Sequence, residues 1–208
     1  MSEHAHRAAA DEHVLDAEER AQAVRFLRSA DRDRYRVAHL ALRRLLGAYL
    51  DRDPAAVELG REPCPGCGGP HGRPAVPGAP LHFSLSHSGD LALLAFAGTP
   101  VGIDVEQVPS PGTAAEVARA LHPAERAELA ETPDALLPAA FARCWTRKEA
   151  YLKGTGTGLA ENPAVTYVSA GPVPACPPGW TVTDIPVPAD YAAACAVRLT
   201  RTDHAASP

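Results

Sequence analysis

The chain has 208 residues, of which 46 % are hydrophobic and 22 % are charged, and its formal net charge is −5. This length is enough for one large domain or two small lobes with a sizeable core. The acidic balance predicts no nucleic-acid partner, and the lack of a long apolar stretch predicts no membrane span.

Both the N-terminus and the cysteines indicate the compartment. Residues 1–13 lack the basic and then apolar layout of a secretory signal. The chain has five cysteines, and an odd number in a chain without an export signal favours reduced thiols. We therefore expect a cytoplasmic protein, and we expect it to be a monomer.

The N-terminal part of the chain predicts two helices, at residues 16–28 and 31–50. In the second helix, Asp31 is a candidate cap, and apolar residues and arginines separate onto two faces. The apolar face is expected to carry Tyr35, Ala38, Leu42, Leu45, Leu46 and Tyr49. The basic face carries Arg32, Arg34, Arg36, Arg43 and Arg44, and such a face is most often solvated.

Residues 53–80 are dense in proline and glycine, which predicts a loop. Within it, the segment CPGCGGPH offers Cys64, Cys67 and His71 as part of a zinc site, with His82 as a fourth ligand. The alternative is a surface loop without metal, because no second CxxC completes the usual four-ligand pattern. The sequence leaves both interpretations open.

Three strands are predicted next, in the segments LHFSLS, LALLAFAG and VGIDVE, which are separated by HSGD and by a Gly-Thr-Pro turn. In VGIDVE, alternate residues place Asp104 and Glu106 on one face of the strand. Taken alone, such a pair is more often the solvated face of an edge strand.

The C-terminal half predicts helices near 113–121, 123–131 and 138–153, and strands within 181–197. Pro123 suits a first helical position, and the GTGTGL segment suits a helix stop. In the long helix, Glu149 shares a face with Phe141, Trp145 and Leu152, where a carboxylate needs a compensating charge. A divalent metal shared with Asp104 and Glu106 would supply it. The alternatives are a surface ion pair of Glu149 with Lys153 and a solvent-facing Lys148.

Three segments in this order, FSLSHSGD, VGIDVE and WTRKEAYLK, resemble the Sfp-type 4′-phosphopantetheinyl transferases, and the resemblance covers about residues 20–200. It implies an α+β fold, a pseudo-dimer of two similar α/β lobes with the active site in the cleft between them. We accordingly expect an N-terminal lobe at residues 1–100 and a C-terminal lobe at residues 101–208, in one compact enzyme unit.

The resemblance also implies a reaction. Such enzymes transfer the phosphopantetheine arm of coenzyme A to a serine of an apo acyl or peptidyl carrier protein, and they release adenosine 3′,5′-bisphosphate. The carrier would belong to a pathway such as polyketide or nonribosomal peptide biosynthesis.

Residue roles follow from the matching motifs. Asp104, Glu106 and Glu149 would hold Mg²⁺, or Mn²⁺, on the diphosphate of coenzyme A, and Glu149 would also accept the serine proton. Lys153 would meet the diphosphate and assist the leaving group. The residues expected to bind the rest of coenzyme A are His87 at the 3′-phosphate, Ser86 nearby, and, on weaker matches, Arg73 and Arg34.

The carrier is expected to dock on residues 108–137, through the apolar candidates Val117, Ala118, Leu121 and Leu129 or through a basic rim. Core packing is the alternative for each of the four. Glu125 matches another acidic position of the family and would either touch the metal or brace the cleft. Two rival functions are a metal-dependent phosphohydrolase that uses the same carboxylates, and an interaction module stabilised by zinc at CPGCGGPH.

Overall fold

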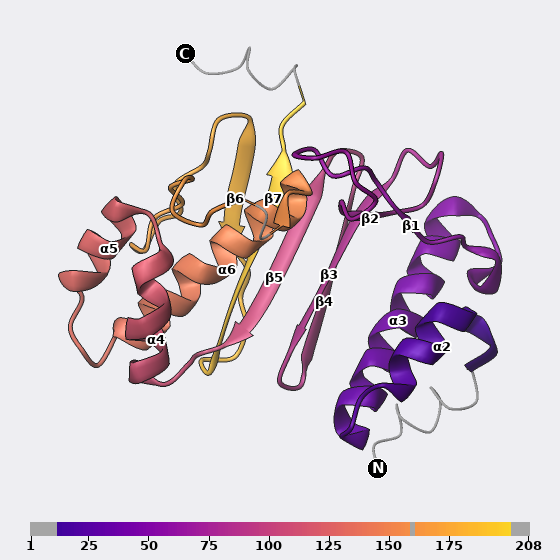
Figure 1. Cartoon of the computed structure of the whole chain (residues 1–208), viewed down its shortest axis with the longest axis horizontal. Helices are drawn as coiled ribbons and strands as arrows, with labels where there is room; N and C mark the ends of the chain where they lie inside the picture. Colours follow the sequence, from indigo (N-terminus) through magenta and orange to yellow (C-terminus); the bar gives the residue numbers. More distant parts are fainter. Residues whose placement is uncertain (1–11, 159–160, 201–208) are drawn as a thin grey trace. The chain divides into compact units, whose positions relative to one another are not determined.

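The computed structural model describes residues 12–158 and 161–200 (Figure 1). Most of the N-terminal segment used to exclude an export signal, and Leu159 of GTGTGL, lie outside these residues. The chain divides into two units, residues 1–59 and 60–208, which are described separately below. The mixed helix and strand class is confirmed. The likeness of two lobes, their boundary at residue 100 and a cleft between them stay predictions.

The first unit is helical. It contains η1 (Glu12–Val14), α2 (Ala17–Val24), α3 (Ser29–Leu50) and η2 (Pro54–Ala56), so both predicted helices are confirmed. Helix α2 begins with a capping box, in which Asp16 and Glu19 each accept the other's backbone N–H. The cap predicted for α3 is wrong, because that helix begins two residues before Asp31, which instead pairs with Arg34 at 2.9 Å.

Arg43 organises this unit, although the sequence placed it on a solvated face. Its side chain is 1 % exposed, and its guanidinium lies 2.5 Å from Glu19 and 2.5 Å from Asp16. A third contact runs 2.9 Å to the carbonyl of Val57. The buried face of α3 differs from the predicted apolar face. Leu40, which was not predicted to be on it, is buried, while Leu45 and Tyr49, which were, are exposed. The acidic capping box of α2 therefore has its counter-charge on α3.

The second unit begins with a loop, as the proline and glycine content predicted. The loop is closed by two short antiparallel strands, β1 (Gly60–Arg61) and β2 (Pro74–Ala75). The next strands, β3 (His82–Ser88) and β4 (Leu91–Ala97), form an antiparallel hairpin. Strands β5 (Val101–Gln107), β7 (Tyr191–Arg198) and β6 (Trp180–Asp184) form a three-stranded antiparallel sheet in that order.

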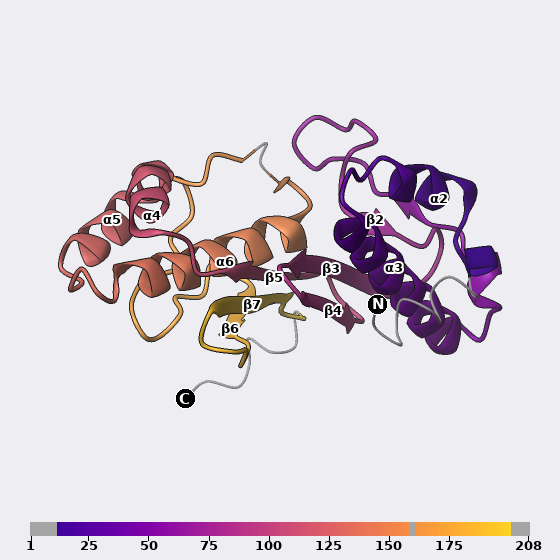
Figure 2. The same cartoon turned by 90° about the horizontal axis from the view of Figure 1, so that it is seen from below.

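Three helices complete the second unit. Helix α4 (Pro111–Val117) leads through η3 (Ala118–Ala120) to α5 (Pro123–Ala130), which begins at Pro123 as predicted. Helix α6 (Leu137–Thr155) ends at Gly156 in the left-handed region, with φ of 81°, so the predicted stop is confirmed. Figure 2 shows α6 lying along the β5–β7–β6 sheet. None of the helices in the described part of the chain has the length and apolar character that a membrane span needs.

Close packing of β5 on α6 positions the residues of interest. A Cβ atom at Gly102 would overlap the carbonyl oxygen of Ala150, so only glycine lets the strand approach the helix this closely. Gly154 is similarly close to the ring of Trp180. This contact brings the D-x-E pair of β5 beside the last two turns of α6.

Hydroxyl groups join the hairpin to the sheet. Three serines of β3, each two residues apart, accept hydrogen bonds from backbone N–H groups of β5. The pairs are Ser84 with Ile103 at 3.1 Å, Ser86 with Val105 at 3.3 Å, and Ser88 with Gln107 at 3.2 Å. These side-chain contacts, which we call the serine ladder, hold β3 against β5. Figure 1 shows the two strands next to each other.

Candidate active site

A cavity of about 270 Å³ opens where β3, β5 and the end of α6 meet. It is lined by Leu85, Ser86, His87, Asp104, Glu106, Glu149 and Lys153. The three resembling segments therefore converge, although 67 residues separate Ser86 from Lys153 in the sequence.

Asp104 lies at the centre of the polar contacts and is only 2 % exposed. Its Oδ1 accepts hydrogen bonds from Lys153 Nζ at 2.6 Å and from Ser86 Oγ at 2.8 Å. Lys153 Nζ also donates to Ser86 Oγ at 3.0 Å. Asp104 Oδ2, in contrast, is a buried oxygen with no hydrogen-bond partner among the described residues. A buried carboxylate oxygen in that state lacks the cation or donor that normally compensates it. This burial excludes the solvated edge-strand interpretation for Asp104.

The pKa values of Glu106 and Glu149 are both raised, and for similar reasons. Burial raises the pKa of Glu149, and the negative charges of Asp104 and Glu106 raise it further, against the opposing effect of Lys153. Burial also raises the pKa of Glu106, with Asp104 adding to the effect, although Ser88 donates a hydrogen bond to its Oε2 at 2.8 Å. Three carboxylates thus face one ammonium, and the cavity has an excess of negative charge.

Carboxylates around a small cavity suit a hard divalent cation, which prefers oxygen ligands. Their donor atoms are not drawn together as tightly as those of a preformed site. Within the described residues, the only group of three His, Cys, Asp or Glu side chains with donor atoms inside 4.8 Å of one another is Cys64, Cys67 and His71. In this arrangement the ammonium of Lys153 sits on Asp104 Oδ1. The metal role of Asp104, Glu106 and Glu149 stays a prediction.

The two arginines proposed for coenzyme A do not line this cavity. Arg73 donates to the carbonyl of Gly154 at 2.8 Å and pairs with Glu62 at 2.6 Å, so it holds the end of α6. Arg34 belongs to the first unit, where it pairs with Asp31. Coenzyme contacts of either arginine stay predictions.

The opposite side of α6 carries Lys148, for which a position facing solvent was one alternative, and its partner is Glu125. Lys148 is 1 % exposed and lies 2.9 Å from Glu125, which is 0 % exposed. The solvent-facing interpretation of Lys148 is therefore wrong. Glu125 also accepts hydrogen bonds from the backbone N–H groups of His122 and Val168, at 3.0 and 2.8 Å. It lies outside the cavity lining, and its contacts are those of a brace between α5, α6 and the segment after α6.

Sequence reasoning missed two kinds of supporting residue. The first is Ser88, which donates a hydrogen bond to Glu106; Ser86 was expected near coenzyme A, and its hydrogen bond to Asp104 was not. The period-two spacing of the two serines opposite the D-x-E pair was the available signal. The second is Arg147, which is 0 % exposed and pairs with Asp184 at 2.6 Å. No local pattern distinguishes it from a surface arginine.

Comparisons with known proteins identify the family of this chain. The model of the 4′-phosphopantetheinyl transferase superfamily matches residues 100–196, which include β5 and α6. The 4′-phosphopantetheinyl transferase HetI of a Nostoc species is 34 % identical over 186 residues, covering 85 % of this chain and 75 % of that protein. A 4′-phosphopantetheinyl transferase of Bacillus subtilis is 31 % identical over 149 residues, and Sfp of Bacillus subtilis strain 168 is 25 % identical over 147 residues.

The match to the two Bacillus proteins covers 71 % and 70 % of this chain and 62 % of each of them. An identity of 34 % over three quarters of the HetI chain is enough to assign the family. This chain belongs to the 4′-phosphopantetheinyl transferase superfamily, and the family inferred from its three motifs is confirmed.

Proposed function

We propose that this protein transfers the 4′-phosphopantetheine group of coenzyme A to a serine of an apo acyl or peptidyl carrier protein and releases adenosine 3′,5′-bisphosphate. The observation that carries the proposal is the cavity in which Asp104, Glu106, Glu149 and Lys153 meet, in a chain of this family. The two-lobe arrangement and the cleft expected from the resemblance belong to the same proposal.

The residues present fit a divalent cation. Asp104 Oδ2 is buried without a partner, and the pKa values of Glu106 and Glu149 are raised by burial and by their negative neighbours. We infer that these three side chains hold Mg²⁺, with Mn²⁺ as a substitute, together with oxygens of the diphosphate. When bound, the metal neutralises charge on the diphosphate and on the transferring phosphoryl group.

The chain's own residues account for the remaining requirements of the step. The hydroxyl oxygen of the carrier serine attacks the phosphorus that bears the pantetheine arm, and the bond from that phosphorus to the bridging oxygen breaks. Glu149 accepts the serine proton, because it is a carboxylate that lines the cavity one helical turn before Lys153. Lys153 places its positive charge where negative charge develops on the bridging oxygen, which leaves with the adenosine 3′,5′-bisphosphate.

Coenzyme binding is assigned to the rim of the cavity. His87 is exposed and lines the cavity, and we assign it to the 3′-phosphate of coenzyme A. Ser86 would act beside it, chiefly by orienting Asp104 and Lys153. Arg73 would act through its contact with Gly154 at the end of α6, and Arg34 stays a candidate by resemblance alone.

Carrier docking is assigned to residues 108–137. The apolar candidates Leu121 and Leu129 are buried in the core with Phe141 and Cys144, so they do not form a docking surface. Val117 and Ala118 are partly buried against the same core. The exposed arginines of this segment, Arg119 and Arg126, would supply the basic rim that an acidic carrier needs.

Intact-protein mass spectrometry tests the proposal. An apo carrier protein is incubated with this protein, coenzyme A and Mg²⁺, beside reactions with EDTA or with Glu149→Gln. We expect a carrier mass gain of one phosphopantetheine with the wild type and no gain in the two controls. His87→Ala should raise the KM for coenzyme A, and it should leave the KM unchanged for a coenzyme A that lacks the 3′-phosphate.

Other outcomes separate the rival functions. Magnesium-dependent breakdown of coenzyme A without any carrier gain, across carriers from fatty-acid, polyketide and nonribosomal peptide systems, would replace the transferase with a phosphohydrolase. Full transfer by Glu149→Gln would remove that residue from the site.

A further inference from the structure

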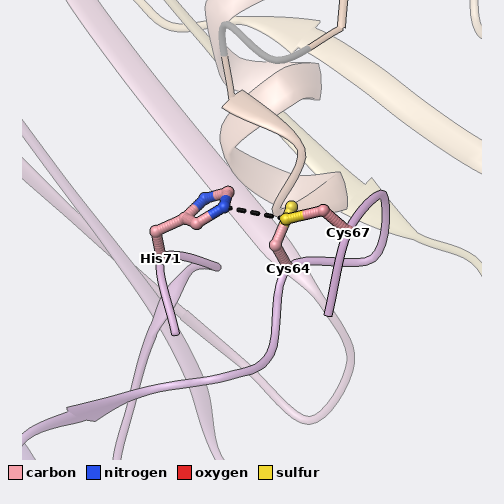
Figure 3. Close-up of side chains that lie close together, drawn as sticks. All are labelled: Cys64, Cys67 and His71. Carbon is pink, nitrogen blue, oxygen red and sulfur yellow. Dashed lines mark hydrogen bonds between the residues drawn. The ribbon is translucent and has the colours of Figure 1, made fainter. Parts of the chain in front are cut away.

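A second cluster of reactive side chains lies in the loop between β1 and β2, outside the cavity of the candidate active site. Cys64, Cys67 and His71 have their donor atoms within 4.8 Å of one another (Figure 3). Cys67 Sγ and His71 Nε2 are 3.0 Å apart. Cys64 is buried, whereas Cys67 and His71 are exposed. Neither thiol is in a disulfide.

The backbone of the loop is folded around these sulfur atoms. The N–H of Cys64 donates to the carbonyl of Gly69 at 2.7 Å, and the N–H of Gly68 donates to the carbonyl of Cys64 at 2.7 Å. Gly68 has a φ of 73°, a value that glycine adopts without strain. The turn then directs the N–H of Gly69 to Cys67 Sγ at 3.4 Å, so that a sulfur atom receives a donor. Donors of this kind stabilise a thiolate, which is the form that binds metal.

The spacing of the three donors suits a zinc ion. Zn–S bonds of about 2.3 Å and Zn–N bonds of about 2.0–2.1 Å place tetrahedral ligands about 3.5–3.8 Å apart. The sulfur-to-nitrogen distance of 3.0 Å is shorter, as expected for a direct hydrogen bond, so His71 needs only a small withdrawal. His71 is exposed and has room for that movement.

We propose that Cys64, Cys67 and His71 bind a zinc ion, with a solvent molecule in the fourth position. Two thiolates and a neutral imidazole leave the centre without net charge, which limits the cost of holding it beside a buried sulfur. The fourth ligand expected from sequence, His82, is not part of the cluster and lies 3.7 Å from Glu62. Among the described residues, the cluster includes no fourth protein ligand.

The loop that would hold the zinc also supports the end of α6. Its stem is closed by Glu62, whose N–H donates to the carbonyl of Arg73, while its own carbonyl accepts from Gly72, both at 3.0 Å. Arg73 in turn holds the carbonyl of Gly154, the residue after Lys153. A metal in this loop would therefore stiffen the segment that holds the end of α6.

Metal analysis of the full chain tests the site. The protein is produced in zinc-supplemented medium, freed of loosely held metal by gel filtration, and measured by inductively coupled plasma mass spectrometry. We expect about one zinc ion per chain. Cys67→Ser and His71→Ala should each lose most of it, and both alter exposed side chains, so the fold is preserved. Cys176→Ser, an exposed thiol outside the cluster, is the matched control and should keep its zinc.

Cobalt and hydrogen exchange give independent readouts. Co²⁺ added to the metal-free wild type should produce thiolate-to-metal absorption that Cys67→Ser weakens and Cys176→Ser retains. Zinc should slow amide exchange across residues 62–73 in the wild type and leave Cys67→Ser unchanged.

Two results would overturn the proposal. One is a wild-type zinc content no higher than that of Cys67→Ser. The other is a Cys64–Cys67 disulfide in reductant-free protein that contains no metal, which would make the pair a redox couple. Neither result bears on the transferase activity, which is measured with magnesium and the carrier.

Discussion

The chain has two lysines, Lys148 and Lys153, and both lie on helix α6. They differ in exposure and in the charges around them. Lys148 is enclosed: Glu125 balances its charge, and the carbonyl of Thr166 accepts another hydrogen bond. Lys153 is 32 % exposed and forms an ion pair with Asp104, and the carboxylates of Glu106 and Glu149 line the same cavity. Five residues of helix rotate a side chain by about 140°, so the two ammonium groups point to different surroundings.

The difference distinguishes a side of α6 whose charges are balanced from a side with an excess of negative charge. On the Lys148 side, the buried carboxylate of Glu125 has a partner for both oxygens, and such a group holds elements together. On the Lys153 side, negative charge exceeds positive charge, and Asp104 Oδ2 lacks a partner. An excess of charge of this kind is typical of cavities that bind a ligand or a cation, which is the role proposed above.

The largest effect on activity should come from the side of α6 that carries Lys153, where Asp104 Oδ2 lacks a partner among the described residues. Asp104→Asn removes the buried carboxylate while keeping its shape, and we expect phosphopantetheine transfer to fall by about 10³-fold or more. The variant should stay folded, because the lost charge was not fully compensated. Rate measurements with a carrier protein, together with circular dichroism, check this. Transfer within tenfold of wild type would mean that Asp104 is not part of the reaction site.

The next largest effect should come from the side of α6 where Lys148 pairs with Glu125, and it should be on stability. Lys148→Met leaves the carboxylate of Glu125 buried without its cation, which costs about 3–5 kcal/mol of unfolding free energy. Urea denaturation measures the loss. The double variant Lys148→Met/Glu125→Gln should lose less than Lys148→Met alone, because no uncompensated charge remains. A double variant that loses as much as the sum of the singles would mean that the two side chains are not coupled.

Lys153 should show the reverse of Lys148. We expect Lys153→Met to reduce kcat by about 10–100-fold, because its charge is needed at the leaving oxygen. The variant should lose less stability than Lys148→Met, because Lys153 is 32 % exposed and its contact with Asp104 is partly screened by solvent. Lys153→Arg keeps the charge and should recover part of the rate. A Lys153→Met variant that is unstable but normally active would mean that Lys153, like Lys148, stabilises the fold and takes no part in the reaction.

The smallest effect concerns Glu149 in the protein without metal. Since the folded-state pKa of Glu149 is raised above its ordinary 4.5 by burial, by Asp104 and by Glu106, its ionised form costs stability at neutral pH. Glu149→Gln should therefore melt at a slightly higher temperature than wild type at pH 7 in EDTA. As the pH falls through the raised pKa toward 4.5, the wild-type carboxyl becomes protonated and the difference should shrink. Thermal denaturation from pH 4 to pH 8 checks both the sign and the trend.

Local patterns predicted most of this molecule. Alternation located β5 and its acidic face, and proline and glycine located the start of α5 and the end of α6. The patterns failed where a tertiary partner decided the outcome. Arg43 and Lys148 are buried because Glu19 and Glu125, more than twenty residues away, accept their charge.

The sequence motifs predicted which residues line the cavity, but they did not predict the contacts that these residues make. The motifs brought Ser86, His87, Asp104, Glu106, Glu149 and Lys153 to one cavity, whereas Arg73 is turned to Gly154. The contacts of Ser88 with Glu106 depend on the register between β3 and β5, which no single segment encodes. The compartment, the monomeric state and the lack of a nucleic-acid partner stay predictions from composition and the N-terminal sequence.

The scarcity of lysine has a chemical consequence. A reagent that acylates amines meets one partly exposed lysine side chain in this protein, because the other is 1 % exposed. The contact of that side chain with Asp104 limits the access of the reagent, and loss of the contact would increase it. The extent of acylation at Lys153, measured on the peptide that contains it, would therefore report whether this contact is intact.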